Sequence, residues 1–449
     1  MLALSGSRYR SGQTAQGRWV RVILLAAGLL LAAPAGADFI GHAGPVRTID
    51  LSADGSRLLS GGFDYTVRLW EFGTQTEEAV LYGHDAPVNI VAFLPGGRRA
   101  LTGGADGKLI LWDLEAREAL REIEAHRSQL ITLAISRDGK LLATAGWDRT
   151  LALWTLEDLA PRARWRLRHN ANALVFGVDE ALYSGHQNGE LLRRDKASGY
   201  VDAEFIGHGL PVTSLLATRD GQRLISAALD GTLWLWDIPQ RRAVRHFVGH
   251  DGPVYRIVLS EDEATLVSVG SDGVLREWTV DSGALRREIT AHDGAAWSVE
   301  LTGDDRFALT AGSDASVRVW HRATGDRIGI PVADTGRPEP WLESDAPGPK
   351  MFRKCAACHA LTTDEPHRSG PHLAGLFGRT AGSVEGYRYS SALERSDVVW
   401  DDETLRALFS EGPDVYLPGT KMPVQKISDP ERLDALIAYL RVLTGPKRD

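Results

Sequence analysis

Cysteine and methionine are scarce in this sequence, which limits the metal and redox sites that it can form. The 449 residues include only two cysteines, Cys355 and Cys358, and three methionines. A structural zinc site takes about four protein ligands, and there is no second cysteine pair to complete one. Both cysteines belong to one short motif. If that motif uses both thiols, no disulfide bond is left, and the fold must rest on packing alone.

A run of basic residues is also missing. The net charge is −8 at pH 7, and residues 1–37 hold four arginines and no acid, so the remaining chain carries −12. An acidic chain without a basic segment gives no support for nucleic-acid binding. Hydrophobic content of 43% and charged content of 24% are ordinary for globular proteins. The length predicts about two or three domains.

Only one apolar stretch is long, and it lies at the N-terminus. Residues 1–37 read as a secretory signal peptide, with arginines first, then the apolar run Val22–Ala33, then Ala35-Gly36-Ala37. The apolar run is too short to span a bilayer comfortably. We therefore expect cleavage after Ala37, a periplasmic location, and no membrane span in the mature form that begins at Asp38. An uncleaved N-terminal anchor is the alternative.

The two cysteines stand in Cys355-Ala356-Ala357-Cys358-His359, a C-x-x-C-H motif that is the attachment signal for a c-type haem. Cysteines three positions apart lie on one side of a helical turn, so both sulfurs can reach the vinyl groups of one porphyrin. His359 would then supply an axial nitrogen ligand to the iron. A redox-active disulfide is the alternative, and the adjacent histidine argues against it. The motif predicts one covalently attached haem c.

A repeat with a period of about 40–42 residues fills the chain from Asp38 to about Pro331. It occurs seven times. Each complete copy contains a histidine, a serine or threonine, an aspartate and a tryptophan, in that order. The fourth copy is weaker, with Asn188 and Arg194 in place of the aspartate and the tryptophan. The histidines are His42, His84, His126, His208, His250 and His292, with His169 in the weak copy; the hydroxyls are Ser60, Thr102, Thr144, Ser184, Ser226, Ser268 and Thr310; the aspartates are Asp64, Asp106, Asp148, Asp230, Asp272 and Asp314; the tryptophans are Trp70, Trp112, Trp154, Trp236, Trp278 and Trp320.

This pattern resembles the WD40 repeat. The resemblance implies an all-β, seven-bladed propeller over residues 38–331, with four strands in each blade and short, protected sheet edges. It also implies that the four recurring residues form a hydrogen-bonded chain inside each blade. The aspartate accepts from the histidine, and the hydroxyl links the histidine to the tryptophan. The repeated histidines are then structural, because one position has been copied, and they are not metal ligands.

The fourth copy also has an unusual charge. Besides Arg194, five arginines fall within about Ala160 to Asp195. One interpretation is sequence drift in a blade that its neighbours hold in place, and we favour it because charges on strands usually face solvent. The other is a basic edge that docks an acidic partner or the C-terminal domain. The arginines are Arg162, Arg164, Arg166, Arg168 and Arg193.

After the repeats, residues 332–347 are rich in proline, glycine and acids and read as a linker. Residues 348–449 resemble an all-α class I cytochrome c of the mitochondrial or c2 type. Three segments besides the C-x-x-C-H motif carry the resemblance: Gly370 to Arg379, Tyr416 to Met422, and the apolar-periodic helix Leu433 to Leu443, whose Leu436 and Tyr439 match positions that cross Gly348 and Phe352.

The cytochrome resemblance implies a role for each candidate site residue. His359 and Met422 would be the two axial ligands. Pro371 would accept a hydrogen bond from His359, which is the brace expected of a ligand histidine. The partners of the buried haem propionate would be Arg379, Tyr389 and Trp400, and Thr420 belongs to the loop that delivers Met422.

Met422 also follows by elimination among the three methionines. Met1 leaves with the signal peptide, and Met351 lies only four residues before Cys355 on the attachment helix. The competing ligands are His367 and His372. One feature departs from the family. Asp414 and Val415 stand where exposed lysines precede the methionine loop, which argues against docking through a lysine ring.

The sequence therefore predicts an exported electron carrier with a His/Met-ligated haem, fused to a propeller that docks periplasmic redox proteins. Catalysis of its own is not required, because both axial positions are filled. Two alternatives remain open. One is an oxidoreductase whose propeller holds a substrate or second cofactor, and the other is a haem-based redox sensor.

The closure of the ring is a further prediction. Asp38-Phe39-Ile40 and Arg327-Ile328-Gly329-Ile330 are both candidates for the outer strand of the last blade. We expect that they cannot share one edge, although they could stack as a fourth and a fifth strand, and we favour the N-terminal segment as the closing strand.

Overall fold

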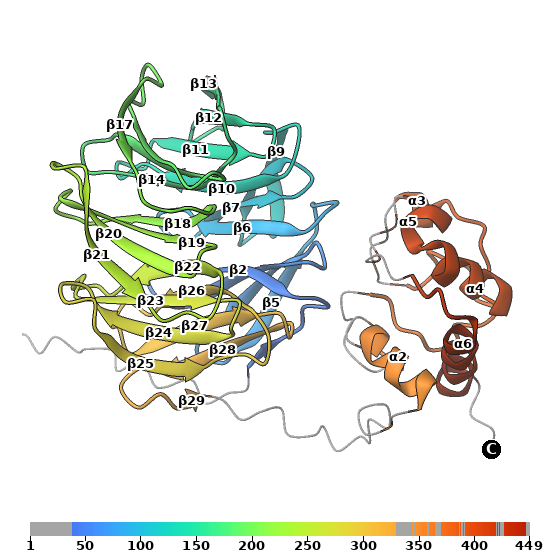
Figure 1. Ribbon diagram of the computed structural model, residues 1–449. Helices are drawn as coiled ribbons and strands as arrows, with labels where there is room; N and C mark the ends of the chain where they lie inside the picture. Colours follow the sequence, from blue (N-terminus) through green and yellow to red (C-terminus); the bar gives the residue numbers. More distant parts are fainter. Residues whose placement is uncertain are drawn as a thin grey trace, which may run out of the picture. The chain divides into compact units, whose positions relative to one another are not determined.

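The computed structural model describes residues 38–328, 344, 346–356, 359–363, 370–385, 387, 389, 391–418, 420, 422 and 426–445. In these ranges an N-terminal domain of strands is followed by a C-terminal domain of helices (Figure 1). The predicted signal peptide 1–37, most of the predicted linker 332–347, and Cys358 lie outside the described residues. The boundaries proposed there stay predictions.

The strands form seven antiparallel sheets, which we call blades one to seven. Blade one contains β2 (Val46–Leu51), β3 (Arg57–Gly62), β4 (Val67–Glu71) and β5 (Thr76–Leu81), and blade two contains β6 (Val88–Phe93), β7 (Arg99–Gly104), β8 (Lys108–Asp113) and β9 (Glu118–Glu124). Blade three contains β10 (Leu130–Ile135), β11 (Leu141–Gly146), β12 (Thr150–Thr155) and β13 (Pro161–Arg166), and blade four contains β14 (Ala171–Phe176), β15 (Leu182–His186), β16 (Leu191–Arg194) and β17 (Val201–Phe205). Blade five contains β18 (Val212–Ala217), β19 (Arg223–Ala228), β20 (Thr232–Asp237) and β21 (Arg242–Val248), and blade six contains β22 (Val254–Leu259), β23 (Thr265–Gly270), β24 (Val274–Thr279) and β25 (Leu285–Thr290). Blade seven contains β26 (Ala296–Leu301), β27 (Phe307–Gly312), β28 (Ser316–His321), β1 (Phe39–Ile40) and β29 (Arg327–Ile328).

The blades are arranged in a ring. The first strand of each blade contacts the first strand of the next, and β26 of the last blade contacts β2 of the first (Figure 1). We call these the inner strands. Each pair of neighbouring sheets buries its facing side chains, as in the cluster of Leu58 and Trp70 with Leu309 and Val317. The predicted seven-bladed propeller is therefore confirmed.

The recurring polar residues form the expected hydrogen-bonded chain in six blades. In blade six, His250 Nδ1 donates to Asp272 at 3.1 Å, Ser268 donates to His250 Nε2 at 2.7 Å, and Trp278 Nε1 donates to Ser268 at 2.9 Å. Over the six complete blades these three distances span 2.9–3.1, 2.7–2.9 and 2.8–2.9 Å. In these six blades the histidine, the hydroxyl, the aspartate and the tryptophan N–H each have a hydrogen-bond partner. The burial of these polar side chains is therefore tolerated.

The blade chain also controls the protonation of its aspartates. Burial alone would raise the pKa of Asp314, but the hydrogen bond and charge of His292 lower that pKa to about 2. The aspartate therefore stays ionised at neutral pH and fixes the histidine tautomer, with the proton on Nδ1.

Blade four corrects one prediction. His169 was expected to be its chain histidine, but His186 takes that place. Ser184 donates to His186 Nε2 at 2.9 Å, and His186 Nδ1 donates to the backbone oxygen of His169 at 3.2 Å. Ser184 and His186 are two residues apart on β15, so both side chains point to one face of the sheet. Burial lowers the pKa of His186 to about 4, so it is neutral.

The arginines of the weak copy divide between two blades, which is a second correction. Arg162, Arg164 and Arg166 lie on β13, the outer strand of blade three, whereas Arg193 lies on β16 of blade four. Arg193 forms an ion pair with Asp179 at 2.6 Å. Arginines on an exposed outer strand are a usual protection against pairing with another chain.

Arg194 is buried where the other blades have tryptophan. It is 8% exposed, its Nη1 donates to the Gly199 oxygen at 3.3 Å, and its Nε has no partner among the described residues. The position has kept its burial, but it has lost its link to the hydroxyl of Ser184.

We predict different stability changes for the two kinds of blade. Trp278→Phe leaves the buried Ser268 hydroxyl short of a donor and should lower the free energy of unfolding by about 1–3 kcal/mol. Arg194→Met keeps most of the side-chain length and removes a poorly paired buried charge, so it should cost less than about 1 kcal/mol. Chemical denaturation of both variants checks this. Equal destabilisation would mean that Arg194 is a structural replacement for tryptophan.

The ring is closed by two short strands that share one edge, which corrects our expectation that they could not. β1 pairs with β28 through Phe39–Val317 and Ile40–Ser316, and β29 pairs with the same strand through Ile328–Val319 and Arg327–Trp320. The other edge of β28 is occupied by β27. The outer strand of blade seven is therefore composite, with one half from each end of the propeller.

An ion pair joins the two halves of this composite strand. Asp38 is 7% exposed, and its carboxylate accepts hydrogen bonds from Arg327, including one from Nε at 3.0 Å. Arg318 of β28 lies 4.0 Å from the same carboxylate and 2.7 Å from Asp314. We call the contact of Asp38 with Arg327 the clasp.

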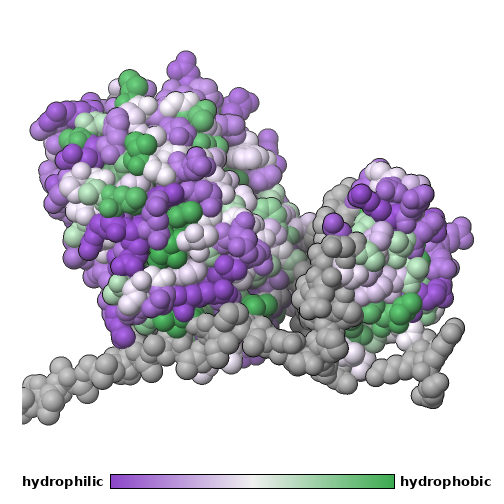
Figure 2. All heavy atoms as spheres, turned by 60° about the horizontal axis from the view of Figure 1, so that its bottom comes forward, coloured by the Kyte–Doolittle hydropathy of each residue, from purple (hydrophilic) through white to green (hydrophobic). Residues whose placement is uncertain are grey.

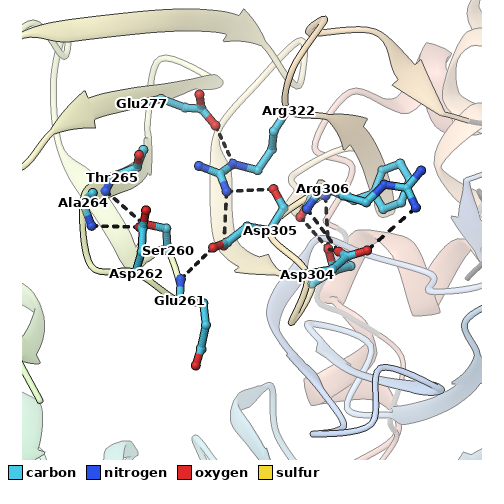
Figure 3. A network of polar contacts seen from close by, with 12 residues as sticks. Ser260, Glu261, Asp262, Ala264, Thr265, Glu277, Asp304, Asp305, Arg306 and Arg322 are labelled. Atoms are coloured by element: carbon cyan, nitrogen blue, oxygen red, sulfur yellow. Dashed lines mark hydrogen bonds and ion pairs between the residues drawn. The ribbon is translucent and has the colours of Figure 1, made fainter. Parts of the chain in front are cut away.

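Polar contacts also link neighbouring blades through their turns (Figure 3). Arg322 follows β28, and its Nε donates to Glu277 of β24 at 2.6 Å. Asp305 accepts from the backbone N–H of Glu261 at 2.8 Å. Outside this view, Glu261 pairs with Arg219 of blade five at 2.6 Å. These contacts therefore join blade five to blade six and blade six to blade seven.

The C-terminal domain contains five helices within its described residues. They are α2 (Pro347–Ala356), α3 (Ser391–Glu394), α4 (Asp402–Glu411), α5 (Pro413–Tyr416) and α6 (Pro430–Thr444), and one isolated β-bridge joins Thr380 and Val399. No helix in the described part of the chain is long and apolar enough to cross a membrane.

α2 and α6 cross as the sequence predicted. A Cβ on Gly348 would lie 2.5 Å from the backbone oxygen of Ala435, so only glycine allows this approach. Phe352 packs edge-to-face on Tyr439 at 5.7 Å, and Leu436 is buried in the same core.

Candidate functional site

The end of α2 positions Cys355 and His359. Cys355 is buried in the core of the C-terminal domain, and its backbone oxygen accepts from the His359 N–H at 2.9 Å. This is the i to i+4 bond of an α-helical turn, so His359 follows Cys355 by one turn on the same side. Cys358 lies outside the described residues.

His359 is fixed by Pro371. Its Nδ1 lies 2.7 Å from the Pro371 oxygen. A carbonyl can only accept, so Nδ1 carries the proton and Nε2 is the unprotonated ring nitrogen. This is the arrangement that a histidine needs to bind a metal through Nε2, and the expected His359–Pro371 contact is present.

Met422 lies in the loop that follows α5. Thr420 N–H donates to the Leu417 oxygen at 3.0 Å, and Met422 N–H donates to the Thr420 hydroxyl at 3.2 Å. Met422 packs against the core cluster that also contains Cys355. Thr420 therefore supports the backbone of Met422.

Arg379, Tyr389 and Trp400 provide polar groups in the same region. Arg379 donates to the oxygens of Ala374 at 2.8 Å and His372 at 2.9 Å, which holds its guanidinium in place. Burial lowers the pKa of Arg379 and raises that of Tyr389. The backbone N–H of Trp400 donates to the Arg379 oxygen at 2.9 Å, and the Trp400 oxygen accepts from the Gly378 N–H at 2.7 Å.

These residues line one cavity in the helical domain. Its wall is mostly apolar, and α4 contributes much of it. The lining residues discussed above are Cys355, His359, Pro371, Arg379, Tyr389, Trp400, Thr420 and Met422, and the apolar wall includes Leu373, Leu376, Leu405, Leu408, Phe409, Leu417 and Leu440. The cavity combines an imidazole, a thioether and a thiol with an apolar wall and donors for an anion. This donor set fits a haem with propionates.

The histidines that compete with Met422 as the second ligand are His367 and His372. His372 is not among the described lining residues, and its Nδ1 lies 3.5 Å from Arg379. His367 lies outside the described residues. Sequence reasoning missed Leu405, Leu408 and Phe409, although the periodicity of α4 and its Asp401–Thr404 capping box were readable signals.

Family comparisons agree with this division of the chain. The model described as "WD domain, G-beta repeat" matches residues 36–71, 75–113, 117–155, 199–237, 241–279 and 283–321, slightly more than half of the chain. The model "Cytochrome c" matches residues 346–444. This chain belongs to the WD40-repeat family and carries a C-terminal cytochrome c domain.

The relatives found match the cytochrome c domain. It is 42% identical to a cytochrome c of Nigella damascena over 101 residues, which is 22% of this chain and 90% of that protein. It is 43% identical to cytochrome c2 of Agrobacterium tumefaciens (strain II Chrys) over 98 residues, 21% of this chain and 87% of that protein. A cytochrome c homolog of Rickettsia typhi is 42% identical over 94 residues, 21% of this chain and about half (53%) of that protein.

The six matches to the WD40 repeat leave out residues 156–198, which include most of blade four. That gap agrees with the loss of tryptophan and aspartate there. The cytochrome c relatives imply haem c as the cofactor of this chain, and the WD40 propeller is a second, separate module.

Proposed function

We propose that this protein is an exported electron carrier. The cytochrome c domain would bind one haem c covalently through Cys355 and Cys358, and the WD40 propeller would dock periplasmic redox partners. The observation that carries the proposal is the single cavity lined by Cys355, His359 and Met422.

Each side chain in the cavity has a proposed task. Bound haem supplies one-electron exchange between Fe(II) and Fe(III). His359, through Nε2, and Met422, through its sulfur, would hold the iron, and Pro371 keeps the His359 ring in its orientation through the 2.7 Å hydrogen bond. Arg379, Tyr389 and Trp400 receive the buried propionate, and Thr420 holds the Met422 backbone.

Two protein ligands explain why we favour a carrier over an enzyme. If His359 and Met422 both hold the iron, the haem would have no open position for a substrate or a gas. A rigid cavity with an apolar wall also keeps the reorganisation around the iron small, which suits electron transfer.

Export is part of the proposal. The support is the N-terminal sequence, with its arginines, the run Val22–Ala33 and the small residues Ala35 to Ala37. Periplasmic maturation also suits thioether attachment, which takes place outside the cytoplasmic membrane in bacterial c-type cytochromes.

Carbon monoxide tests whether the haem has an open position. The purified reduced protein should keep its absorption spectrum under carbon monoxide, because Met422 occupies the sixth position. A haem with an open position would bind carbon monoxide and change its spectrum at once. Cell fractionation tests the export, since the mature protein should be periplasmic and begin at Asp38. Cytoplasmic haem-free protein would contradict the proposal.

A further inference from the structure

The inner strands of the propeller depart from repeat symmetry on three neighbouring blades. Equivalent positions in a repeat have the same structural task, so a departure confined to a few blades requires another reason. The second residue of each inner strand is Arg47, Asn89, Ile131, Asn172, Thr213, Tyr255 and Trp297 in blades one to seven, and the fifth residue is Asp50, Ala92, Ala134, Val175, Leu216, Val258 and Glu300. The large aromatic and charged residues at these positions all belong to blades six, seven and one.

Arg47, Trp297 and Tyr255 form a stack across these three blades. The Arg47 guanidinium lies over the Trp297 ring at 4.5 Å, and Tyr255 stacks on Trp297 at 4.4 Å with an interplanar angle of 18°. Phe63, from the turn between β3 and β4, lies 6.2 Å from Trp297. The aromatic rings hold the guanidinium in one orientation, while its N–H edge stays unused.

Arg47 has no acidic partner. No carboxylate of the described residues lies within ion-pair distance of it, and it forms no hydrogen bond with them. By contrast, Arg256 lies 3.5 Å from Glu300 and Arg276 lies 2.6 Å from Glu288. Burial lowers the pKa of Arg47, although the residue is still partly exposed.

The indole N–H of Trp297 is unsatisfied too. It is buried and has no partner among the described residues, whereas the six blade tryptophans all donate to a hydroxyl. Two donor groups therefore lie side by side without an acceptor. An unsatisfied donor of this kind costs stability, so its presence in a regular repeat protein requires an explanation.

The two acidic residues on these inner strands, Asp50 and Glu300, have other partners. Asp50 accepts from the Phe93 N–H at 2.6 Å, and Arg256 pairs with Glu300. Burial, and then the charge of Glu300, raise the pKa of Asp50 to about 8, so Asp50 is protonated at neutral pH. Neither acid neutralises Arg47.

We propose that Arg47 and Trp297 form a binding site for an acidic side chain of a protein partner. A guanidinium offers a planar fork of donors that fits a carboxylate, and the Trp297 ring beneath it holds the fork in place. The aromatic cluster of Phe63, Tyr255 and Trp297 gives an apolar contact for residues beside the acid, as a polypeptide would present. This inference deepens the docking role of the propeller and does not depend on the haem assignment.

The charge and the hydrogen-bond donors of this site indicate which kind of ligand it binds. Donors without acceptors select an anion, and the neighbouring rings favour one carried on a partly apolar chain over a free hydrated ion. The propeller surface near its edges is mostly hydrophilic with small hydrophobic spots (Figure 2), and no extensive apolar face competes as a docking surface in that view.

Stability measurements separate this binding role from a structural one. Arg47→Met removes an unpaired charge from the full-length protein, so the thermal midpoint of the propeller should stay equal or rise by about 2–4 °C. Arg256→Met is the matched control, because Arg256 has an acidic partner on the same group of strands. That variant should lower the midpoint. If Arg47→Met lowers the midpoint as much as Arg256→Met, Arg47 is structural and the proposal is wrong.

Peptide binding tests the ligand. A short synthetic peptide that alternates Glu and Leu should bind the full-length protein in calorimetry, and one that alternates Lys and Leu should not. Arg47→Gln should weaken the binding about 10- to 100-fold, and Arg47→Lys and Trp297→Phe should weaken it less. Binding of acetate alone with equal affinity, unchanged binding to Arg47→Gln, or no binding of the acidic peptide to the wild type would each overturn the proposal.

Discussion

Met422→Ala should abolish the weak near-infrared band that methionine-ligated ferric haem shows and lower the reduction potential by on the order of 0.1–0.2 V. A thioether is a soft ligand that favours Fe(II), so its loss stabilises Fe(III). Among the described residues that line the cavity, Met422 is the one methionine. Its backbone N–H donates to the Thr420 hydroxyl at 3.2 Å. Absorption spectroscopy and a redox titration of the purified protein measure both effects.

Met351→Leu is the matched control for this prediction. Met351 lies on α2 and packs against the same hydrophobic core, but it is not among the residues that line the cavity. Its replacement should leave the band and the potential unchanged. If Met422→Ala keeps both the band and the potential, another residue is the sixth ligand and the assignment of Met422 is wrong.

Loss of the clasp should give the largest change in propeller stability. Asp38→Ala removes a carboxylate whose side chain is 4% exposed and leaves Arg327 without its partner. We expect the free energy of unfolding to fall by about 2–4 kcal/mol, because one half of an ion pair remains at a partly buried position. Removal of residues 38–40 should lower it further, since the backbone pairing of Phe39 and Ile40 with β28 is lost as well.

Glu261→Ala serves as the control for the clasp. Glu261 pairs with Arg219, and both side chains are more than half exposed, so this change should cost less than about 0.5 kcal/mol. The haem spectrum should be unchanged in every clasp variant. An unaltered melting midpoint after removal of residues 38–40 would mean that β29 alone closes the ring.

Most of the propeller could be predicted because the same sequence pattern recurs from blade to blade. The spacing of Trp70, Trp112 and their counterparts gave the blade count, and each blade repeats the same local pattern. Blade four escaped this reasoning. There the chain histidine moved from a loop, at His169, to a strand, at His186, and only the folded sheet shows that Ser184 and His186 share a face.

The composite outer strand could not be read from the sequence. Two short segments from opposite ends of the propeller share the edge of β28, and their registers depend on the closed ring. Pairing between segments so distant in sequence leaves no local pattern. The same limit applies to Arg47 and Trp297, which meet only because blades seven and one are neighbours in the ring.

The cytochrome site divides in the same way. Cys355 and His359 form a local motif, and their relation through one helical turn follows from their spacing. Arg379 and Tyr389 were placed by family resemblance, since nothing in their immediate sequence indicates a shared cavity. The apolar wall from α4 was overlooked because leucines and phenylalanine at helical spacing have the same appearance in any core.

Acid–acetone extraction of the purified protein tests the central claim most directly. We predict that the haem stays with the polypeptide and that the ratio of haem to chain is one, because Cys355 and Cys358 would hold it through thioether bonds. Haem that moves into the acetone phase, or protein that carries none after export through a c-type maturation system, would contradict the account.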